Sequence, residues 1–229
     1  MLRVVFFDVG NTLIYTYTYP SVGEIYSSVG RRYGMDLDPG EVNASFRAAF
    51  MRYGAVPLVD RSTEADWWKR IVRETVSAQC EPRDFDGFFR ELYDFFTGKE
   101  AWRLFPDVLP ALEALKARGV TLGIISNWDS RLIPTLENLG LAPYFSVTAV
   151  SALVGHAKPD SGIFAHALDR VGVRPQESLH VGDHPELDCL GAKRCGMEAL
   201  LIDRSQDGGS MAACGRIRSL TEIVEHLEG

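Results

Sequence analysis

The sequence predicts an α/β protein built on a parallel sheet, with one long segment that is entirely helical. Residues 107–229 alternate between apolar runs typical of strands and periodic stretches typical of helices. That alternation indicates a parallel sheet covered by helices on both faces. Residues 15–98 show helical periodicity but no run typical of a buried strand. We therefore predict that residues 15–98 are inserted into an α/β core made of residues 1–14 and 99–229.

The strands of the core are predicted by short apolar runs rich in β-branched residues. Such runs are typical of strands buried on both faces. Each run is followed by a turn or by a residue with a polar side chain. The predicted strands are residues 4–7 (VVFF), 120–125 (VTLGII), 178–181 (SLHV) and 198–202 (EALLI).

The helices of the core are predicted by apolar residues at helical spacing. Asp107 suits the N-cap of the first of them, and glycines follow several of their ends. Pro134 lies inside a further periodic stretch, where it would cost about 3 kcal/mol in a helix interior. We therefore expect that helix to begin near Ile133, with Pro134 in its first turn. The other helices are expected within residues 107–118, 161–172, 186–196 and 219–229.

Composition narrows the class of protein and its partners. The 229 residues are 46% hydrophobic, enough for a sizeable core, and the net charge is −7. A nucleic-acid surface usually needs a basic face, so we expect no nucleic-acid partner, although a few local cations could still bind an anionic substrate. No run approaches the roughly 18 apolar residues of a membrane helix, and the segment before Asp8 is too short for a signal peptide. We expect a cytoplasmic protein, with no membrane partner and no pattern that indicates an oligomeric state.

The four cysteines are expected to be free thiols. They are Cys80, Cys189, Cys195 and Cys214, and none stands in a CxxC pair. A zinc site or a disulfide framework is therefore not indicated.

Polar residues follow three of the predicted strands at the point where each strand ends. Asp8 follows the first strand, Ser126 and Asn127 follow the second, and Asp183 follows the third. The carboxyl ends of parallel strands border the ligand crevice of such sheets, so these side chains should converge on one site. Lys158 lies in a loop marked by glycine and proline before a predicted helix.

The order and spacing of these residues resemble the motifs of the haloacid-dehalogenase-like superfamily of hydrolases. The first motif is DVGNT at residues 8–12, the second contains Ser126 in IISN, and the third is Lys158 in KPD. The fourth is VGDHPELDCLGAKRCGM, in which Asp183 and Asp188 match the family's GDxxxxD pair. The resemblance implies a Rossmann-like core, with residues 15–98 as a helical cap.

The resemblance also implies catalytic roles. Asp8 would be the nucleophile that forms an aspartyl-phosphate, which divides hydrolysis into two easier steps. Lys158 would neutralise the charge of the transferred phosphoryl group and hold the Asp8 carboxylate. Thr12, Ser126 and Asn127 would bind the substrate, Ser126 through its hydroxyl and Asn127 through its backbone amide.

A magnesium site is implied in the same way. Asp8, Asp183 and the backbone carbonyl of Gly10 would be the protein ligands of Mg²⁺, a hard cation that prefers oxygen. Asp188 would lie behind them and orient Lys158 or water ligands, although it could also be a solvated acid on a helix.

Gly10 departs from the family pattern. In the family's phosphatases an aspartate stands two residues after the nucleophile, where it protonates the leaving group and activates water. General acid–base help is worth typically 10²–10⁴-fold, so we expect weak turnover, most of all for alkoxide leaving groups. Another residue could supply the acid, and His184 or, less readily, His156 is a candidate.

The sequence is therefore compatible with several functions. We expect a Mg²⁺-dependent hydrolase of a small phosphorylated molecule. The alternatives are a catalytically impaired protein that binds a phosphorylated ligand or a partner, and a metal-independent dehalogenase. Lys69 could in principle form a Schiff base, but it is expected on a solvated helix face. Trp67 and Trp68 are adjacent, so we expect one to pack in the cap and the other to face the cleft or the core domain.

Overall fold

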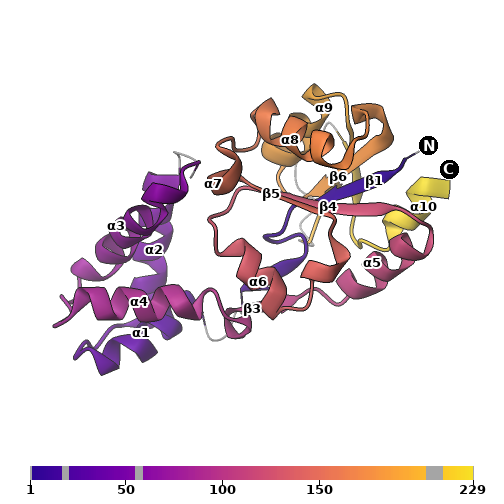
Figure 1. Cartoon of the computed structure of the whole chain (residues 1–229). Coiled ribbons are helices and arrows are strands. Elements are labelled where there is room, and N and C mark those ends of the chain that lie inside the picture. Colours follow the sequence, from indigo (N-terminus) through magenta and orange to yellow (C-terminus); the bar gives the residue numbers. More distant parts are fainter. Residues whose placement is uncertain (1, 17–20, 55–58, 205–213, 229) are drawn as a thin grey trace.

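A six-stranded α/β unit stands beside a group of four helices in the computed structural model (Figure 1), which describes residues 2–16, 21–54, 59–204 and 214–228. All pairs of neighbouring strands in the six-stranded sheet are parallel. The predicted α/β fold with a parallel, Rossmann-like sheet is therefore confirmed. In spatial order the strands are β5 (Val147–Val150), β4 (Thr121–Ser126), β1 (Val4–Phe7), β6 (Ser178–Gly182), β7 (Glu198–Ile202) and β8 (Gly215–Ile217).

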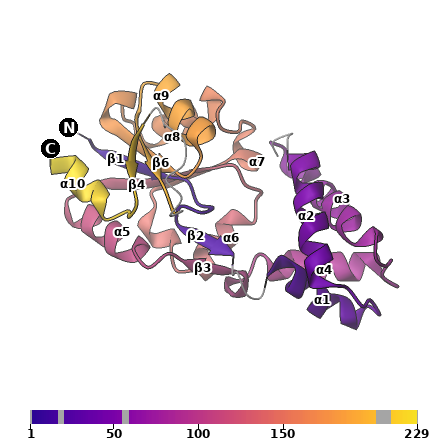
Figure 2. The same ribbon diagram turned by 180° about the vertical axis from the view of Figure 1, so that it is seen from behind.

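Two layers of helices cover the sheet, because alternate residues of its strands point to opposite faces. Val5 and Phe7 of β1 belong to one buried cluster, while Val4 and Phe6 belong to a second. Figures 1 and 2 show α8 and α9 over one face, and α5, α6 and α10 over the other. The helices of this unit are α5 (Val108–Ala117), α6 (Leu132–Asn138), α7 (Ser151–Val154), α8 (Ser161–Val171), α9 (Gly191–Arg194) and α10 (Glu222–Glu228).

The helical group, as we call α1 to α4, has a core of its own. Tyr26 and Phe88 are buried there with their rings edge to face, 6.0 Å between centroids. Capping side chains fix two of the helix starts, since Ser21 accepts from the backbone of Glu24 and Asp84 from that of Gly87. The four helices are α1 (Val22–Arg32), α2 (Pro39–Gly54), α3 (Glu64–Ser77) and α4 (Phe85–Phe95).

A two-stranded antiparallel ribbon lies where the chain passes between the two parts. β2 (Ile14–Thr16) pairs with β3 (Trp102–Leu104), so the segment that leaves the α/β unit runs beside the one that returns. The predicted boundary at residue 15 falls inside β2, and the division into a core and a cap stays a prediction. In Figure 1 the amino end of β1 is on the side away from the helical group, so the carboxyl ends of the strands face that group.

The predicted helices of the α/β unit are present, with two differences in detail. Residues 186–196, predicted as one helix, form a π-helix over Pro185–Leu190 that continues into the short α9. α6 begins at Leu132 and has Pro134 in its first turn, close to the expected start.

Asp107 stands at the N-cap position of α5, but its side chain makes no capping bond. Its Oδ2 instead accepts from Arg204 Nη1 and from the backbone of Leu220, each at 2.7 Å. Asp107 therefore ties α5 to the end of the chain.

The expectation of four free thiols is wrong. A disulfide joins Cys189 and Cys214, whose Cα atoms lie 6.1 Å apart, while Cys80 and Cys195 are free. The two bonded cysteines are 25 residues apart in sequence and stand in no motif, so only the fold brings them together. Across the described part of the chain, no helix combines the length and the apolar character needed to cross a membrane.

Candidate active site

The carboxyl ends of β1, β4 and β6 bring the predicted residues together. Asp8 directly follows β1, Ser126 is the last residue of β4, and Asp183 follows β6. Lys158 reaches the same place from the loop between α7 and α8. The three strands are adjacent and parallel, so their ends meet at one edge of the sheet.

Asp8 is held by two donors. Its Oδ1 lies 2.6 Å from Lys158 Nζ and 3.0 Å from Ser126 Oγ. All three side chains are buried. Burial raises the pKa of Asp8, as does the Asp188 carboxylate, while Lys158 opposes both. The carboxylate therefore depends on nearby positive charge to stay ionised.

Asp188 holds Lys158 from the other side. Lys158 Nζ lies 2.5 Å from Asp188 Oδ1, and the same oxygen lies 2.9 Å from His180 Nε2. The backbone amide of His184 donates to Asp188 Oδ2 at 3.0 Å. Burial works to raise the pKa of Asp188, but Lys158 and His180 outweigh it, so this carboxyl has a pKa well below its usual range. Asp188 is thus a fixed anion that positions the lysine.

His180 was not predicted from the sequence. It is fully buried within β6, where a histidine in an apolar run gives a weak signal by itself. Gly182, two residues later, is required by the same arrangement. A Cβ atom on Gly182 would lie 2.2 Å from Asp188 Cγ, closer than any real contact allows. The strand end is therefore shaped to admit the Asp188 carboxylate.

An acidic cluster lies at the mouth of the sheet. One oxygen from each of Asp8, Asp183 and Asp188 lies within 4.8 Å of the others. Burial, followed by the charges of Asp8 and Asp188, raises the pKa of Asp183 to about 7, although a hydrogen bond from Asn11 opposes this. Three carboxylates share one lysine, so the ionised cluster carries excess negative charge. A divalent cation with oxygen ligands fits this donor set.

Two of the predicted substrate contacts, Asn127 and Thr12, differ in whether their side chains are already bonded. Asn127 Nδ2 donates to the Lys158 carbonyl at 2.9 Å, and Asn127 Oδ1 accepts from the Lys158 amide at 2.7 Å. The Asn127 side chain thus holds the lysine loop. The Thr12 hydroxyl is buried and has no hydrogen-bond partner among the described residues. Asn11 has a positive φ of 52°, which asparagine adopts more readily than most residues, and this bends the chain after Asp8.

Gly10 leaves open space where the family pattern has an acid. The nearest atom to a Cβ built on Gly10 is Cζ3 of Trp128, at 3.6 Å, an ordinary contact distance. His184 is exposed, and its Nδ1 accepts from the backbone of Glu186 and Leu187. His156 lies 3.2 Å from Asp160, with both side chains more than half exposed. Both candidate histidines therefore have structural partners elsewhere.

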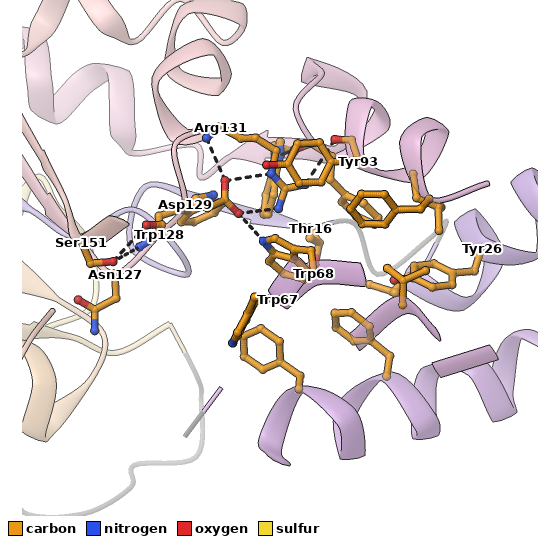
Figure 3. Close-up of a pocket in the computed structure, with 18 of the residues that line it drawn as sticks. Thr16, Tyr26, Trp67, Trp68, Tyr93, Asn127, Trp128, Asp129, Arg131 and Ser151 are labelled. Atoms are coloured by element: carbon orange, nitrogen blue, oxygen red, sulfur yellow. Dashed lines mark hydrogen bonds and ion pairs between the residues drawn. The ribbon is translucent and has the colours of Figure 1, made fainter. Parts of the chain in front are cut away.

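A cavity of about 720 Å³ lies between the helical group and the α/β unit, and Asn127 and Lys158 are among its lining residues. Figure 3 shows Trp67 and Trp68 on one side, and Asn127 and Trp128 on the other. We expected one of the adjacent tryptophans to pack in the cap and the other to face the cleft or the core domain, but both line the cavity. Their rings are perpendicular, with centroids 4.8 Å apart, and this lets both line the cavity.

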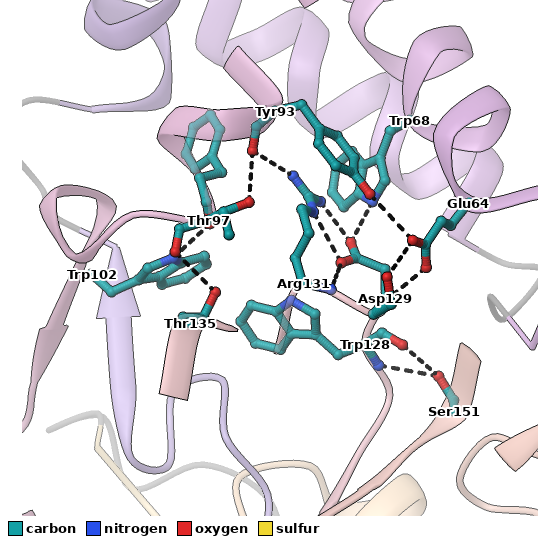
Figure 4. Close-up of polar contacts among 12 residues, drawn as sticks. Glu64, Trp68, Tyr93, Thr97, Trp102, Trp128, Asp129, Arg131, Thr135 and Ser151 are labelled. Atoms are coloured by element: carbon teal, nitrogen blue, oxygen red, sulfur yellow. Dashed lines mark hydrogen bonds and ion pairs between the residues drawn. The ribbon is translucent and has the colours of Figure 1, made fainter. Parts of the chain in front are cut away.

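An interface cluster of Trp68, Tyr93, Asp129 and Arg131 joins the two parts beside the cavity (Figure 4). Asp129 accepts two bonds from the Arg131 guanidinium, at 2.9 and 2.6 Å, and one from Trp68 Nε1 at 2.6 Å. The guanidinium of Arg131 lies 3.9 Å from the ring centroid of Tyr93 and 4.8 Å from that of Trp68. The charges of Asp129 and Arg131 are therefore paired with each other, and the guanidinium also stacks on two aromatic rings.

A second contact reinforces the first. The backbone amide of Ser130 donates to Glu64 Oε2 at 2.9 Å, and the Ser130 hydroxyl donates to Glu64 Oε1. Lys69, by contrast, pairs with Asp86 at 2.9 Å and is not among the residues that line the cavity. Nothing in its surroundings favours a Schiff-base role.

Comparison with known proteins agrees with this geometry. Residues 2–196 match a family model described as haloacid dehalogenase-like hydrolase. The chain is 36% identical over 214 residues to haloacid dehalogenase-like hydrolase domain-containing protein 3 of Danio rerio, covering 90% of this chain and 87% of that protein. It is 28% identical to a phosphoserine phosphatase of Thermus thermophilus, covering 89% of each. The crystal structure of a HAD phosphatase from Thermococcus onnurineus superposes with a TM-score of 0.73 at 27% identity, covering 100% of this chain and 99% of that one.

Proposed function

The chain belongs to the haloacid dehalogenase-like hydrolase family, and on that premise we propose that it hydrolyses a small phosphomonoester with Asp8 as the nucleophile. One observation carries the proposal: the Asp8 carboxylate at the end of β1 is held by Lys158 Nζ at 2.6 Å and by Ser126 Oγ at 3.0 Å. Two similar proteins bear the name phosphatase, which supports phosphate as the group transferred.

The proposed reaction has two steps. An Asp8 oxygen attacks phosphorus, the bond from phosphorus to the leaving oxygen breaks, and that oxygen departs with the electron pair. Water then attacks the phosphorus of the aspartyl-phosphate, the bond from phosphorus to the Asp8 oxygen breaks, and Asp8 returns as a carboxylate. The inorganic phosphate keeps one proton of the water, and the other passes to solvent, which balances the proton that the leaving oxygen takes up. Lys158 and the Ser126 hydroxyl would stabilise the phosphoryl oxygens, since such catalysis depends on positioning and charge.

We propose Mg²⁺ as the cofactor, with Asp8, Asp183 and the carbonyl of Gly10 as its protein ligands. When bound it would neutralise phosphoryl charge and balance the acidic cluster. Asp188 would not need to bind the ion, because its Oδ1 is already 2.5 Å from Lys158 Nζ. Asp188 would keep Lys158 directed at Asp8, and Asn127 would hold the loop that carries it.

The test is phosphate release from a panel of acetyl phosphate, phenyl phosphate, phosphoserine and phosphoglycolate, with Mg²⁺ and with a chelator. We expect Mg²⁺-dependent release that Asp8→Asn abolishes. Asp36→Asn is the matched control, because it makes the same chemical change at an exposed residue outside the site. Release that persists in Asp8→Asn, or no release from any substrate, contradicts the proposal.

A second candidate is a protein that binds a phosphorylated ligand without turnover. Gly10 favours it, because the position beside the nucleophile has only the Trp128 ring as a near neighbour and no acid. Calorimetry distinguishes the two, since this candidate requires Mg²⁺-dependent phosphate binding and no release from any ester. Dehalogenation is a weaker candidate, because a carboxylate such as Asp183 beside the nucleophile has no evident task in a metal-independent reaction.

A further inference from the structure

We infer that the cavity beside Lys158 receives an uncharged aromatic leaving group, so that the substrate is an aryl phosphomonoester. This inference rests on the proposed function and names its substrate class. It is carried by three features of the cavity: its aromatic lining, the pairing of its charged residues and the lack of an acid at Gly10.

Aromatic side chains from both parts of the protein line the cavity. From the helical group, Phe50 lies 6.0 Å from Trp67 and 6.2 Å from Trp68 between ring centroids. From the other side, Trp102 and Trp128 lie 5.1 Å apart. Rings at such distances present flat apolar faces and edges to whatever enters, which is the surface that best contacts another ring.

Phe50 is the one aromatic among the large hydrophobic residues that are clearly exposed in the described chain. It is 42% exposed, although its neighbours in the lining are partly covered. An aromatic ligand in the cavity would cover the part of the Phe50 ring that faces solvent.

Every charged residue in the lining is already paired. These residues are Asp129, Arg131 and Lys158. Asp129 and Arg131 form a two-bond ion pair, and Lys158 bridges the Asp8 and Asp188 carboxylates. Among its described residues, the lining thus offers no free cation for a second anionic group and no free anion for an ammonium group. This disfavours phosphoserine and phosphoglycolate and favours a leaving group without charge.

The chemistry of the leaving oxygen points the same way. An alkoxide needs a proton as it leaves, because its conjugate acid has a pKa near that of water, about 15.7. A phenolate needs much less help, since the pKa of a phenol such as tyrosine is about 10. Gly10 supplies no proton, and the nearest atom to a Cβ at this position is Cζ3 of the Trp128 ring, which has no acidic group. The site is therefore suited to esters whose oxygen leaves as a stable anion.

Binding of phosphonates tests the inference without turnover, because their carbon–phosphorus bond is not an ester. With Mg²⁺ present, we expect phenylphosphonate to bind the wild-type protein about tenfold tighter than methylphosphonate, a difference of ~1.4 kcal/mol. Phosphonoacetate, with its second anion, should bind no tighter than methylphosphonate. Phe50→Ala and Trp67→Ala should each lower the ratio of phenyl- to methylphosphonate affinity at least threefold, with circular dichroism to verify folding.

Met51→Ala is the matched control, because Met51 neighbours Phe50 on α2 but is 77% exposed and does not line the cavity. Equal affinities for the two phosphonates, or a ratio that Trp67→Ala and Phe50→Ala leave unchanged, would overturn the inference. Release of phosphate from acetyl phosphate together with equal affinities would overturn this inference alone. A preference for phenylphosphonate in a protein that releases no phosphate would support the aromatic pocket and refute hydrolysis.

Discussion

The strand ends and the aromatic cavity differ in how tightly their side chains are held. At the strand ends, Asp8, Lys158 and Asp188 form a chain of short contacts of 2.6 and 2.5 Å, and each group has at least two partners. In the cavity, Phe50 and Trp67 touch other rings at longer range, and Phe50 is partly in solvent. The side chains at the strand ends are therefore already held in position by one another. Those in the cavity still have exposed surface that a ligand can cover.

That difference implies different responses to mutation. A substitution at the strand ends should damage stability and turnover together, because it leaves a buried charge without its partner. A substitution in the cavity should change mainly which molecules bind. The interface cluster lies between the two regions and should affect both.

The largest effect is expected for Lys158→Met, which leaves Asp8 and Asp188 facing each other without the shared cation. We expect a loss of about 3–5 kcal/mol in unfolding free energy, and a fall in phosphate release of at least ~10²–10³-fold. Urea unfolding and phosphate assays measure the two. Lys116→Met, at an exposed lysine on α5, is the control. A fully stable Lys158→Met protein would contradict the proposed difference between the two regions, because the strand ends would then tolerate an unpaired acid.

Asp129→Asn should come next, because it removes the charge that faces buried Arg131 and weakens the bond from Trp68. We expect a loss of about 3 kcal/mol, together with a shift in tryptophan fluorescence as the surroundings of Trp68 change. Asp66→Asn, at an exposed position on α3, should do neither. A loss below about 1 kcal/mol would show that the interface cluster behaves like a surface ion pair.

Gly10→Asp should raise activity selectively. A Cβ at this position meets Trp128 at 3.6 Å, an ordinary contact distance, so there is room for a side chain to begin there. We expect about a 10²-fold rise in kcat/KM for alkyl phosphates, and a smaller rise for phenyl phosphate, whose oxygen leaves without a proton. Gly10→Asn, which adds similar bulk but no acid, is the control. Equal gains with both substrates would indicate that Gly10 does not set the preference for the leaving group.

The smallest of these effects is expected on thermal stability when Mg²⁺ is added. A saturating ligand stabilises the folded state, by ~1.4 kcal/mol when its concentration is tenfold above Kd. Mg²⁺ should therefore raise the Tm of the wild-type protein by a few degrees and that of Asp183→Asn by less. Differential scanning fluorimetry with Mg²⁺ and with a chelator measures both. An identical shift in the two proteins would place the ion elsewhere.

The sequence predicts the buried strands of the sheet well and its edges poorly. β1 and β4 are largely apolar runs buried almost throughout, and their burial leaves a clear pattern. β5 and β8, which the sequence did not indicate, are the two edge strands of the sheet. Edge strands are short and partly exposed, so they need no continuous apolar run. Their pairing is decided by the neighbouring strand rather than by their own residues.

The site shows the same division between local and distant information. Asp8, Ser126 and Asp183 were predictable because each stands at the end of a strand. The hydrogen bond from Trp68 to Asp129 joins residues 61 positions apart in sequence, and no sequence spacing predicts it. The contact of His180 was not predictable either. It depends on Asp188, which the π-helix after β6 places beside Gly182. Contacts that depend on packing between elements appear only once the chain is folded.

The β2–β3 ribbon also determines how the two parts of the protein can move. The outgoing and returning segments are hydrogen-bonded side by side, with Ile14 opposite Leu104 and Thr16 opposite Trp102. Two separate tethers would allow the helices to tilt in any direction, whereas a paired ribbon bends easily only across its flat face. Ile14 is six residues from Asp8, and its backbone already bonds to Val9. A hinge at this ribbon would transmit the swing of the helices directly to the turn that carries the nucleophile.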